Sequence, residues 1–354
     1  MKKITGPILV KDICLMMKRR ASMNIRFNKI ISHYFEDTEY TLGAVPFGLT
    51  NTTKILEIHG QRFIVRIYNR HLKTMDGIEL ECKVTAFLEG THSSFQVPLF
   101  HRAIDGQNYL LLEDGTLASI TSFLEGTVPQ LSSVDKSKKF GQLVGEFSTR
   151  MQGFPIGKQV CRGSSFTKMY EIHPLANHQS IKAFYKNSPF ELSVSKVTFY
   201  QKMITEIKSS NLRLEILPQQ LVHHDLLIYN LLAQNEEITG VLDFDFIGVD
   251  AAFMEFVISF NHVVQESQGS MEMIESFLQG YGSERKHSAL EFSYLPLLTQ
   301  IYYIAVLHFY IGQHYAGATS EHNFTFMIEQ FERNMNWLEK HNLRIQELLN
   351  RYLV

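Results

Sequence analysis

Residues 221–232 read LVHHDLLIYNLL, and residues 241–245 read VLDFD after a polar turn at 234–240. The first stretch places the polar pattern H-x-D-x-x-x-x-N between two apolar pieces, and the second is strand-like and contains two aspartates. Taken alone, His223, Asp225 and Asn230 could be ordinary loop residues of a β-hairpin. The aspartate pair in the apolar strand that follows favours a catalytic segment over this alternative.

These residue types suit the transfer of a phosphoryl group from ATP to a hydroxyl. That reaction needs a carboxylate to orient the hydroxyl and accept its proton, and oxygen ligands for the magnesium ion that bridges the phosphates. Asp225 fits the first role. Asn230 and Asp243 fit the second, because hard cations prefer carboxylate and amide oxygens, and Asp245 is a candidate for a further ligand. His223 is expected to orient the loop by hydrogen bonding rather than to shuttle protons.

Residues 24–123 are predicted to be mostly β. The predicted elements in chain order are strands at 52–58 and 61–68, a helix at 76–89, and strands at 108–112 and 118–123. His59-Gly60 is the turn that would join the first two strands as a hairpin, and Gly90 is a natural helix stop.

Helical periodicity dominates the rest of the chain, apart from loops and short strands near 217–247. The predicted helices lie at 134–151, 194–210, 271–280, 289–314 and 323–352. We therefore predict an α+β, bilobal chain with a β-rich lobe at 24–123, a larger and mainly helical lobe at 124–354, and a hinge near 122–126. Residues 1–23 are expected to form a short helical or poorly ordered extension.

Composition narrows the class of protein. Hydrophobic residues make up 45% and charged residues 20% of the 354 residues, which is typical of a soluble globular protein. The formal charge of −2 shows no basic excess, so we expect no nucleic-acid partner. Three cysteines without a CxxC pair indicate neither a disulfide framework nor a zinc site, which favours a cytoplasmic setting. We expect no membrane partner, because no apolar run approaches ~18–20 residues.

His223, Asp225, Asn230 and the triplet Asp243-Phe244-Asp245 resemble the catalytic and metal-binding motifs of the aminoglycoside phosphotransferase and choline kinase superfamily. That superfamily includes a homoserine kinase group and has the protein-kinase-like fold. The resemblance covers roughly residues 30–260. It implies an ATP- and Mg²⁺-dependent kinase that phosphorylates a hydroxyl group of a small molecule.

The resemblance also implies a nucleotide site in the first lobe. Asn51 ends the segment GLTN at 48–51, which is similar to the family's nucleotide loop. Arg66 lies in a strand similar to the one whose basic residue reaches the ATP phosphates in the family. Glu81 is similar to the helix glutamate that pairs with that basic residue. The implied adenine-binding hinge comprises Ser122, Phe123 and Leu124. A charge in mid-strand is costly without a partner, which favours a functional Arg66, whereas Asn51 and Glu81 could equally be a turn residue and a surface carboxylate.

Two positions depart from the family pattern. His224 stands where relatives commonly carry glycine, and it could face the substrate or fill space. Glu255 stands where a buried aspartate is usual. Neither change removes the candidate base or a candidate metal ligand.

Three functions stay open from sequence. The first is a metabolic kinase for homoserine or another amino alcohol, and the second is a resistance kinase that modifies an antibiotic. The third is a non-catalytic, kinase-like binding or assembly protein, against which the intact Asp225, Asn230 and Asp243 argue. Aromatic residues at 294–310 could line an acceptor pocket, although their helical spacing is more typical of a core.

Overall fold

The computed structural model describes residues 23–37, 39–45, 50–157, 163–210 and 213–354. They form two compact units. The smaller unit comprises the described residues up to Arg70 together with Leu99–Phe123, and the larger comprises His71–Pro98 and Leu124–Val354. Residues 71–98, expected in the β-rich lobe, thus belong to the larger unit. Residues 1–22 of the expected N-terminal extension lie outside the described residues.

The smaller unit is built on a five-stranded antiparallel sheet of order β1-β2-β3-β5-β4. Its strands are β1 (Tyr40–Ala44), β2 (Thr52–Ile58), β3 (Gln61–Ile67), β4 (Leu110–Leu111) and β5 (Leu117–Ser122). The hairpin of β2 and β3 confirms the prediction. Its turn residues His59 and Gly60 both have positive φ, as the tight turn between two twisted strands requires.

The core of the smaller unit lies between this sheet and a helix at 23–32. Alternate residues of the strands point toward the helix, because side chains of a strand alternate between its two faces. The buried cluster includes Leu56, Ile58, Val65, Ile67, Ala118 and Ile120 from the sheet and Phe27, Ile30 and Ile31 from the helix. Neither this helix nor β1 was predicted from sequence.

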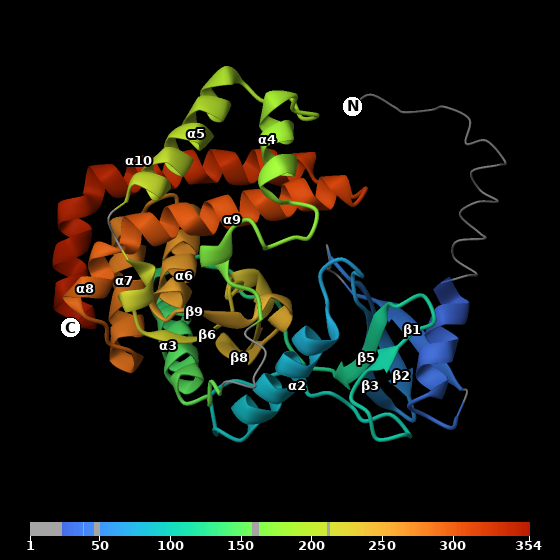
Figure 1. Ribbon diagram of the computed structural model, residues 1–354. Coiled ribbons are helices and arrows are strands. Elements are labelled where there is room, and N and C mark those ends of the chain that lie inside the picture. Colours follow the sequence, from blue (N-terminus) through green and yellow to red (C-terminus); the bar gives the residue numbers. More distant parts are fainter. Residues whose placement is uncertain (1–22, 38, 46–49, 158–162, 211–212) are drawn as a thin grey trace, which may run out of the picture. The chain divides into compact units, whose positions relative to one another are not determined.

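The larger unit is mainly helical (Figure 1). Its helices are α2 (Met75–Glu89), α3 (Val134–Gln152), α4 (His178–Lys186), α5 (Val194–Ser209), α6 (Phe253–Glu266), α7 (Met271–Glu284), α8 (Ala289–Ser293), α9 (Leu295–Tyr315) and α10 (Glu321–Leu353). The larger unit also contains two antiparallel strand pairs. Strand β6 (Gln219–Val222) pairs with β9 (Gly248–Ala251), and β7 (Leu231–Gln234) pairs with β8 (Glu237–Val241). The sequence-based α+β prediction is confirmed.

Two differences from the predicted helices have simple causes. The helix expected at 289–314 is divided at Tyr294, and Pro296 lies in the first turn of α9. Proline lacks a backbone N–H and is favoured in a first helical turn, so it marks a new start. Helix α6 was missed because it is buried on nearly every side and therefore lacks a one-sided apolar period.

Helix α3 supports the segment that leads into the candidate site. Glycines let its backbone touch that of α7, since a Cβ at Gly141 would lie 2.2 Å from the carbonyl oxygen of Phe277. Near its C-terminal end, Phe147 meets the His223 ring edge-to-face with centroids 5.6 Å apart. The packing of α3 on α7 thereby helps to hold the start of the catalytic segment.

Helix α9 is the one described helix that is long and apolar enough to cross a membrane, judged by length and composition. Its apolar window is 78% buried within the protein, as in the core helix of a soluble protein. It packs against α10, α6 and α5 (Figure 1). Of the aromatic residues whose place was open, Tyr294, Tyr302 and Tyr303 are buried in this core, while Phe309 and Tyr310 are half-buried.

Candidate active site

The segment after β6 folds back on itself around Asp225 and Asn230. The Asn230 amide nitrogen donates to the main-chain oxygen of Asp225 at 2.8 Å and to its carboxylate oxygen Oδ2 at 2.7 Å. A short 3₁₀ turn, Ile228–Asn230, makes this return possible. Because both of these bonds use the amide nitrogen, the amide oxygen of Asn230 is the atom suited to a cation.

His223 holds this loop from behind. Its Nε2 donates to the carbonyl oxygen of Leu242 at 3.0 Å, and its Nδ1 accepts from the backbone N–H of Asp225 at 3.2 Å. The ring is fully buried, and burial lowers the pKa of His223 to about 3. It is therefore a neutral imidazole with a fixed tautomer, which is the geometry of an orienting residue rather than of a proton shuttle.

Three other carboxylates act on that of Asp225 at this point. Burial raises the pKa of Asp225 to about 8, and the charges of Asp243, Asp245 and Glu255 add to the shift, while the bond from Asn230 opposes it. Asp243 occupies the left-handed region with φ of 64°, at the turn that follows β8. Each ionised carboxylate at this site disfavours the ionisation of its neighbours, and a bound cation would reduce this repulsion.

The residues present fit a magnesium ion. Within the part of the chain that the structure describes, no three His, Cys, Asp or Glu side chains gather closely enough to form a metal cage. Mg²⁺ seldom uses such a cage, because it is usually bound by one or two carboxylates with water and substrate phosphates. Asp243 and the Asn230 amide oxygen are of the required type, and the raised pKa of Asp225 marks the excess negative charge beside them.

A buried lysine, Lys73, is a site residue that sequence reasoning missed. Its Nζ lies 3.1 Å from Asp245 Oδ1 and also forms an ion pair with Glu81 Oε2, and all three side chains are largely buried. Burial alone would lower the pKa of Lys73, but the two carboxylates raise it overall, so this lysine is charged. The ion pair of Glu81 with Lys73 lies within the larger unit. The pairing of Glu81 with Arg66 that the resemblance implies stays a prediction.

The other predicted nucleotide residues are described within the smaller unit. Asn51 Oδ1 accepts from the backbone N–H of Asn69 at 2.9 Å, so its side chain ties the start of β2 to the segment after β3. Arg66 lies on the inner strand β3, opposite Thr53 and Ser119 of the neighbouring strands. Gly48 and Leu49 of the predicted loop lie outside the described residues.

The hinge residues end β5 and open the larger unit. Ser122 forms two hydrogen bonds with Leu99. Its backbone N–H donates to the Leu99 carbonyl oxygen at 2.8 Å, and its Oγ accepts from the Leu99 N–H at 2.9 Å. The Arg62 guanidinium lies 4.3 Å from the centroid of the Phe123 ring. Leu124 is the first residue of the segment Leu124–Val354, which belongs to the larger unit. Their role in adenine binding stays a prediction.

Glu255 replaces the aspartate of the family pattern and still serves the catalytic loop. Its Oε2 accepts from the backbone N–H of His223 at 2.6 Å, while Oε1 has no hydrogen-bond partner. The side chain is fully buried, and burial raises the pKa of Glu255 to about 7. The longer side chain thus reaches the loop backbone from the first turn of α6.

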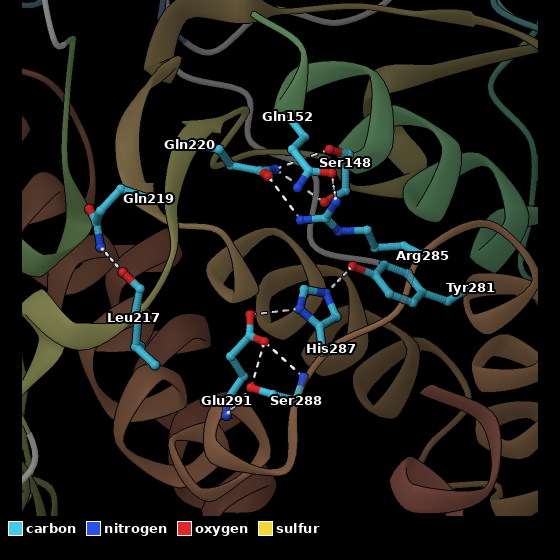
Figure 2. A network of polar contacts seen from close by, with 10 residues as sticks. All are labelled: Ser148, Gln152, Leu217, Gln219, Gln220, Tyr281, Arg285, His287, Ser288 and Glu291. Atoms are coloured by element: carbon cyan, nitrogen blue, oxygen red, sulfur yellow. Dashed lines mark hydrogen bonds and ion pairs between the residues drawn. The ribbon is translucent and has the colours of Figure 1, made fainter. Parts of the chain in front are cut away.

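A polar network anchors β6, the strand that leads into His223 (Figure 2). Gln220 donates to Ser148 Oγ at 3.1 Å, and Arg285 donates to Gln220 Oε1 at 3.3 Å. Figure 2 also shows His287, which lies between the Tyr281 hydroxyl at 2.7 Å and Glu291 at 2.8 Å. These contacts tie β6 to α3 and to the segment after α7, so the network supports the site without taking part in it.

Tyrosines of α9 lie within electrostatic reach of the candidate base. Burial raises the pKa of Tyr310 to about 12, and the Asp225 charge adds to the shift. The pKa of Tyr302 is likewise raised by burial, with smaller contributions from Tyr303 and Asp225. The Tyr302 ring also stacks on Phe166, with centroids 6.2 Å apart. Part of the aromatic stretch therefore responds to the charge of Asp225 as well as to burial in the core.

The chain is similar to known phosphotransferases in sequence. Residues 41–292 match the model of the phosphotransferase enzyme family. A homoserine kinase from Granulibacter bethesdensis is 25% identical over 283 residues, which is 74% of this chain and 79% of the relative. A homoserine kinase from a Bradyrhizobium species is 23% identical over 261 residues, covering 72% of this chain and 73% of that one.

Solved structures share the fold. A microcompartment-associated aminopropanol kinase superposes with a TM-score of 0.67 at 19% identity, covering 90% of this chain and 97% of that one. An amicoumacin kinase, solved with AMP-PNP, Ca²⁺ and its antibiotic, gives a TM-score of 0.64 at 14% identity, covering 93% and 96%. The fold is that of the protein-kinase-like small-molecule kinases, and since the family model spans most of its length, this chain belongs to the phosphotransferase enzyme family.

Proposed function

We propose that this protein is an ATP- and Mg²⁺-dependent kinase that phosphorylates the hydroxyl group of an amine-bearing small molecule in the cytoplasm. The observation that carries the proposal is the arrangement of Asp225, Asn230 and Asp243, in which a carboxylate of raised pKa is hydrogen-bonded to an amide and lies in the field of a second carboxylate. A hydroxyl-activating base beside a cation site is what phosphoryl transfer needs.

In this mechanism Asp225 accepts the proton of the attacking hydroxyl, and His223 and Glu255 hold the loop that carries it. Asn230 and Asp243 would hold the metal, and Asp245 is a further candidate. Bound Mg²⁺ supplies charge compensation for the phosphates. Asn51, Arg66 and residues 122–124 are the proposed nucleotide contacts, and Lys73 keeps Glu81 and Asp245 paired.

The surroundings of the base favour a cationic acceptor. The carboxylates supply negative charge, and Tyr302 and Tyr310 of α9 are aromatic groups near Asp225. Anionic and aromatic groups together suit an ammonium ion. The relatives are named for homoserine and aminopropanol, which carry an amine and a hydroxyl, while amicoumacin represents the antibiotic alternative.

The proposal predicts nucleotide binding and acceptor-dependent ADP release. Calorimetry should detect binding of ATP with Mg²⁺ and much weaker binding without it, because the metal site uses both protein and phosphate oxygens. A coupled assay of ADP release should then give turnover with one member of a panel of L-homoserine, 1-amino-2-propanol, choline, an aminoglycoside and amicoumacin. Absence of Mg-ATP binding would remove the catalytic proposal and favour a non-catalytic binding or assembly role.

The raised pKa of Asp225 predicts proton release when Mg-ATP binds. With a pKa of about 8, Asp225 is largely protonated at pH 7.5 in the free protein. A cation beside Asp243 offsets the charge that raises this pKa, so binding should release up to about 0.8 proton per site. Calorimetry in two buffers of different ionisation enthalpy counts these protons. The variant Asp225→Asn should bind Mg-ATP with much less release, and equal release from both proteins would assign the proton to another group.

A further inference from the structure

His224 has a backbone conformation that disfavours its own side chain. Its φ is 65°, in the left-handed region where a residue with a Cβ is strained by about 1–2 kcal/mol. Glycine would avoid this strain. The imidazole is nevertheless only 1% exposed. A strained and buried side chain next to the candidate base indicates that its contacts compensate for the strain.

Both ring nitrogens of His224 face acceptors. Nδ1 lies 2.9 Å from the carbonyl oxygen of Phe246, and Nε2 lies 3.2 Å from Asp250 Oδ2. Burial alone would raise the pKa of Asp250, but its contact with His224 and its backbone N–H donors lower it overall. The two residues thus form a buried hydrogen-bonded pair within the larger unit.

Asp250 is the meeting point of three segments. Its Oδ2 accepts from Ser165 Oγ at 3.0 Å and from the Thr167 N–H at 3.2 Å, in addition to His224. The neighbouring backbones also touch, since Gly163 and Gly248 form a β-bridge and a Cβ at Gly248 would lie 1.7 Å from the Ser164 carbonyl oxygen. One carboxylate therefore binds the catalytic loop and the turn at 163–168 to β9.

This turn places an aromatic ring beside the site. The Phe166 ring stacks on the His224 ring, with centroids 4.5 Å apart and planes inclined by 27°. The Phe166 ring also stacks on the Tyr302 ring, with centroids 6.2 Å apart and planes inclined by 15°. A continuous stack runs from His224 through Phe166 to Tyr302 of α9, and Tyr302 lies in the field of Asp225.

We propose that His224 is a positioning residue that fixes the base Asp225 relative to an acceptor-side wall formed by Phe166 and Tyr302. The inference rests on the proposed kinase function and extends it to the placement of the acceptor. The base and the wall belong to different segments of the chain, and the hydrogen bond between His224 and Asp250 holds them in one arrangement. Because proton transfer depends on sub-ångström placement, loss of this tie should affect turnover and acceptor KM while leaving nucleotide binding intact.

Substitutions at His224 separate strain from hydrogen bonding. His224→Gly removes the strain and both hydrogen bonds. His224→Asn tolerates positive φ and keeps a donor near the Phe246 carbonyl, but it is too short to reach Asp250. With the acceptor found in the panel of hydroxyl compounds, both variants should lower kcat by about 10- to 100-fold and raise the KM for that acceptor. His92→Gly is the matched control, because exposed His92 also has positive φ, of 51°, in the turn after α2.

A double-mutant cycle with Asp250→Asn tests the tie itself. If His224 acts through Asp250, the double variant His224→Gly/Asp250→Asn should be no slower than the slower single variant. Losses that multiply would show independent roles and overturn the proposal. Wild-type kcat in His224→Gly would overturn it too, and would leave His224 a space-filling residue.

Hydrogen exchange gives a readout that needs no acceptor. The Thr167 amide donates to Asp250, so peptides spanning residues 163–170 should exchange faster in His224→Gly and in Asp250→Asn, but not in His92→Gly. Unchanged exchange in this segment would overturn the tie whatever the activity. If exchange changes as expected while wild-type protein binds no Mg-ATP, the kinase function fails and the structural tie stands.

Discussion

Replacing Asp225 by asparagine is expected to lower turnover by about 10²–10⁴-fold while Mg-ATP affinity changes little, because a general base typically contributes this factor. The substitution keeps the size of the side chain, and the new amide oxygen can still accept the bond from Asn230 Nδ2. What is lost is the charge that takes up the hydroxyl proton. The measurement is kcat from ADP release together with the Mg-ATP dissociation constant from calorimetry.

Two further variants give the contrast that makes this test specific. Asp243→Asn should weaken the magnesium dependence of ATP binding as well as turnover, because it removes a charged metal ligand. Asn230→Ala should have a similar but milder effect on binding, since an amide oxygen contributes no net charge. The assignment would be reversed if Asp225→Asn lost Mg-ATP binding while Asp243→Asn bound it normally.

The candidate catalytic segment could be predicted because the residues of its motif lie close together in the sequence. His223, Asp225 and Asn230, together with the two aspartates that follow β8 in a turn, lie within 23 residues, and β7 pairs with β8, its neighbour in sequence. The hairpin of β2 and β3 was predictable for the same reason, since the residues at its turn and its alternation are neighbours in sequence.

The partners of these residues could not be predicted, because they come from distant parts of the chain. Lys73 and Asp245 are 172 positions apart, and Lys73 lies in an irregular stretch just before the cap of α2. Resemblance therefore assigned the partner of Glu81 to the regular strand that carries Arg66. The contact of His224 with Asp250 depends in the same way on the pairing of β6 with β9. Sequence alone left His224 open between a substrate contact and a space filler.

Replacing Lys73 by methionine is expected to destabilise the protein by about 3–5 kcal/mol, which is typical when one partner of a buried ion pair is removed. Methionine keeps much of the volume of lysine, so the loss is that of charge. Glu81 and Asp245 would then lose the positive charge of Lys73 in a buried setting. Denaturant unfolding at pH 7 measures the change. The matched control is Lys139→Met, since Lys139 also meets two carboxylates, Asp135 and Glu237, but these are exposed, and little change is expected.

The origin of the loss can be separated from a packing defect. The double variant Lys73→Met/Glu81→Gln has one buried carboxylate that has lost Lys73 instead of two, so it should be more stable than Lys73→Met alone. Buried carboxylates that lose this cation also favour their neutral form, so the folded variant should bind protons that the unfolded chain does not, and its deficit should shrink as the pH falls from 7 toward 5. A deficit that stays constant over this range, together with additive losses in the double variant, would mean that Lys73 serves packing and not charge.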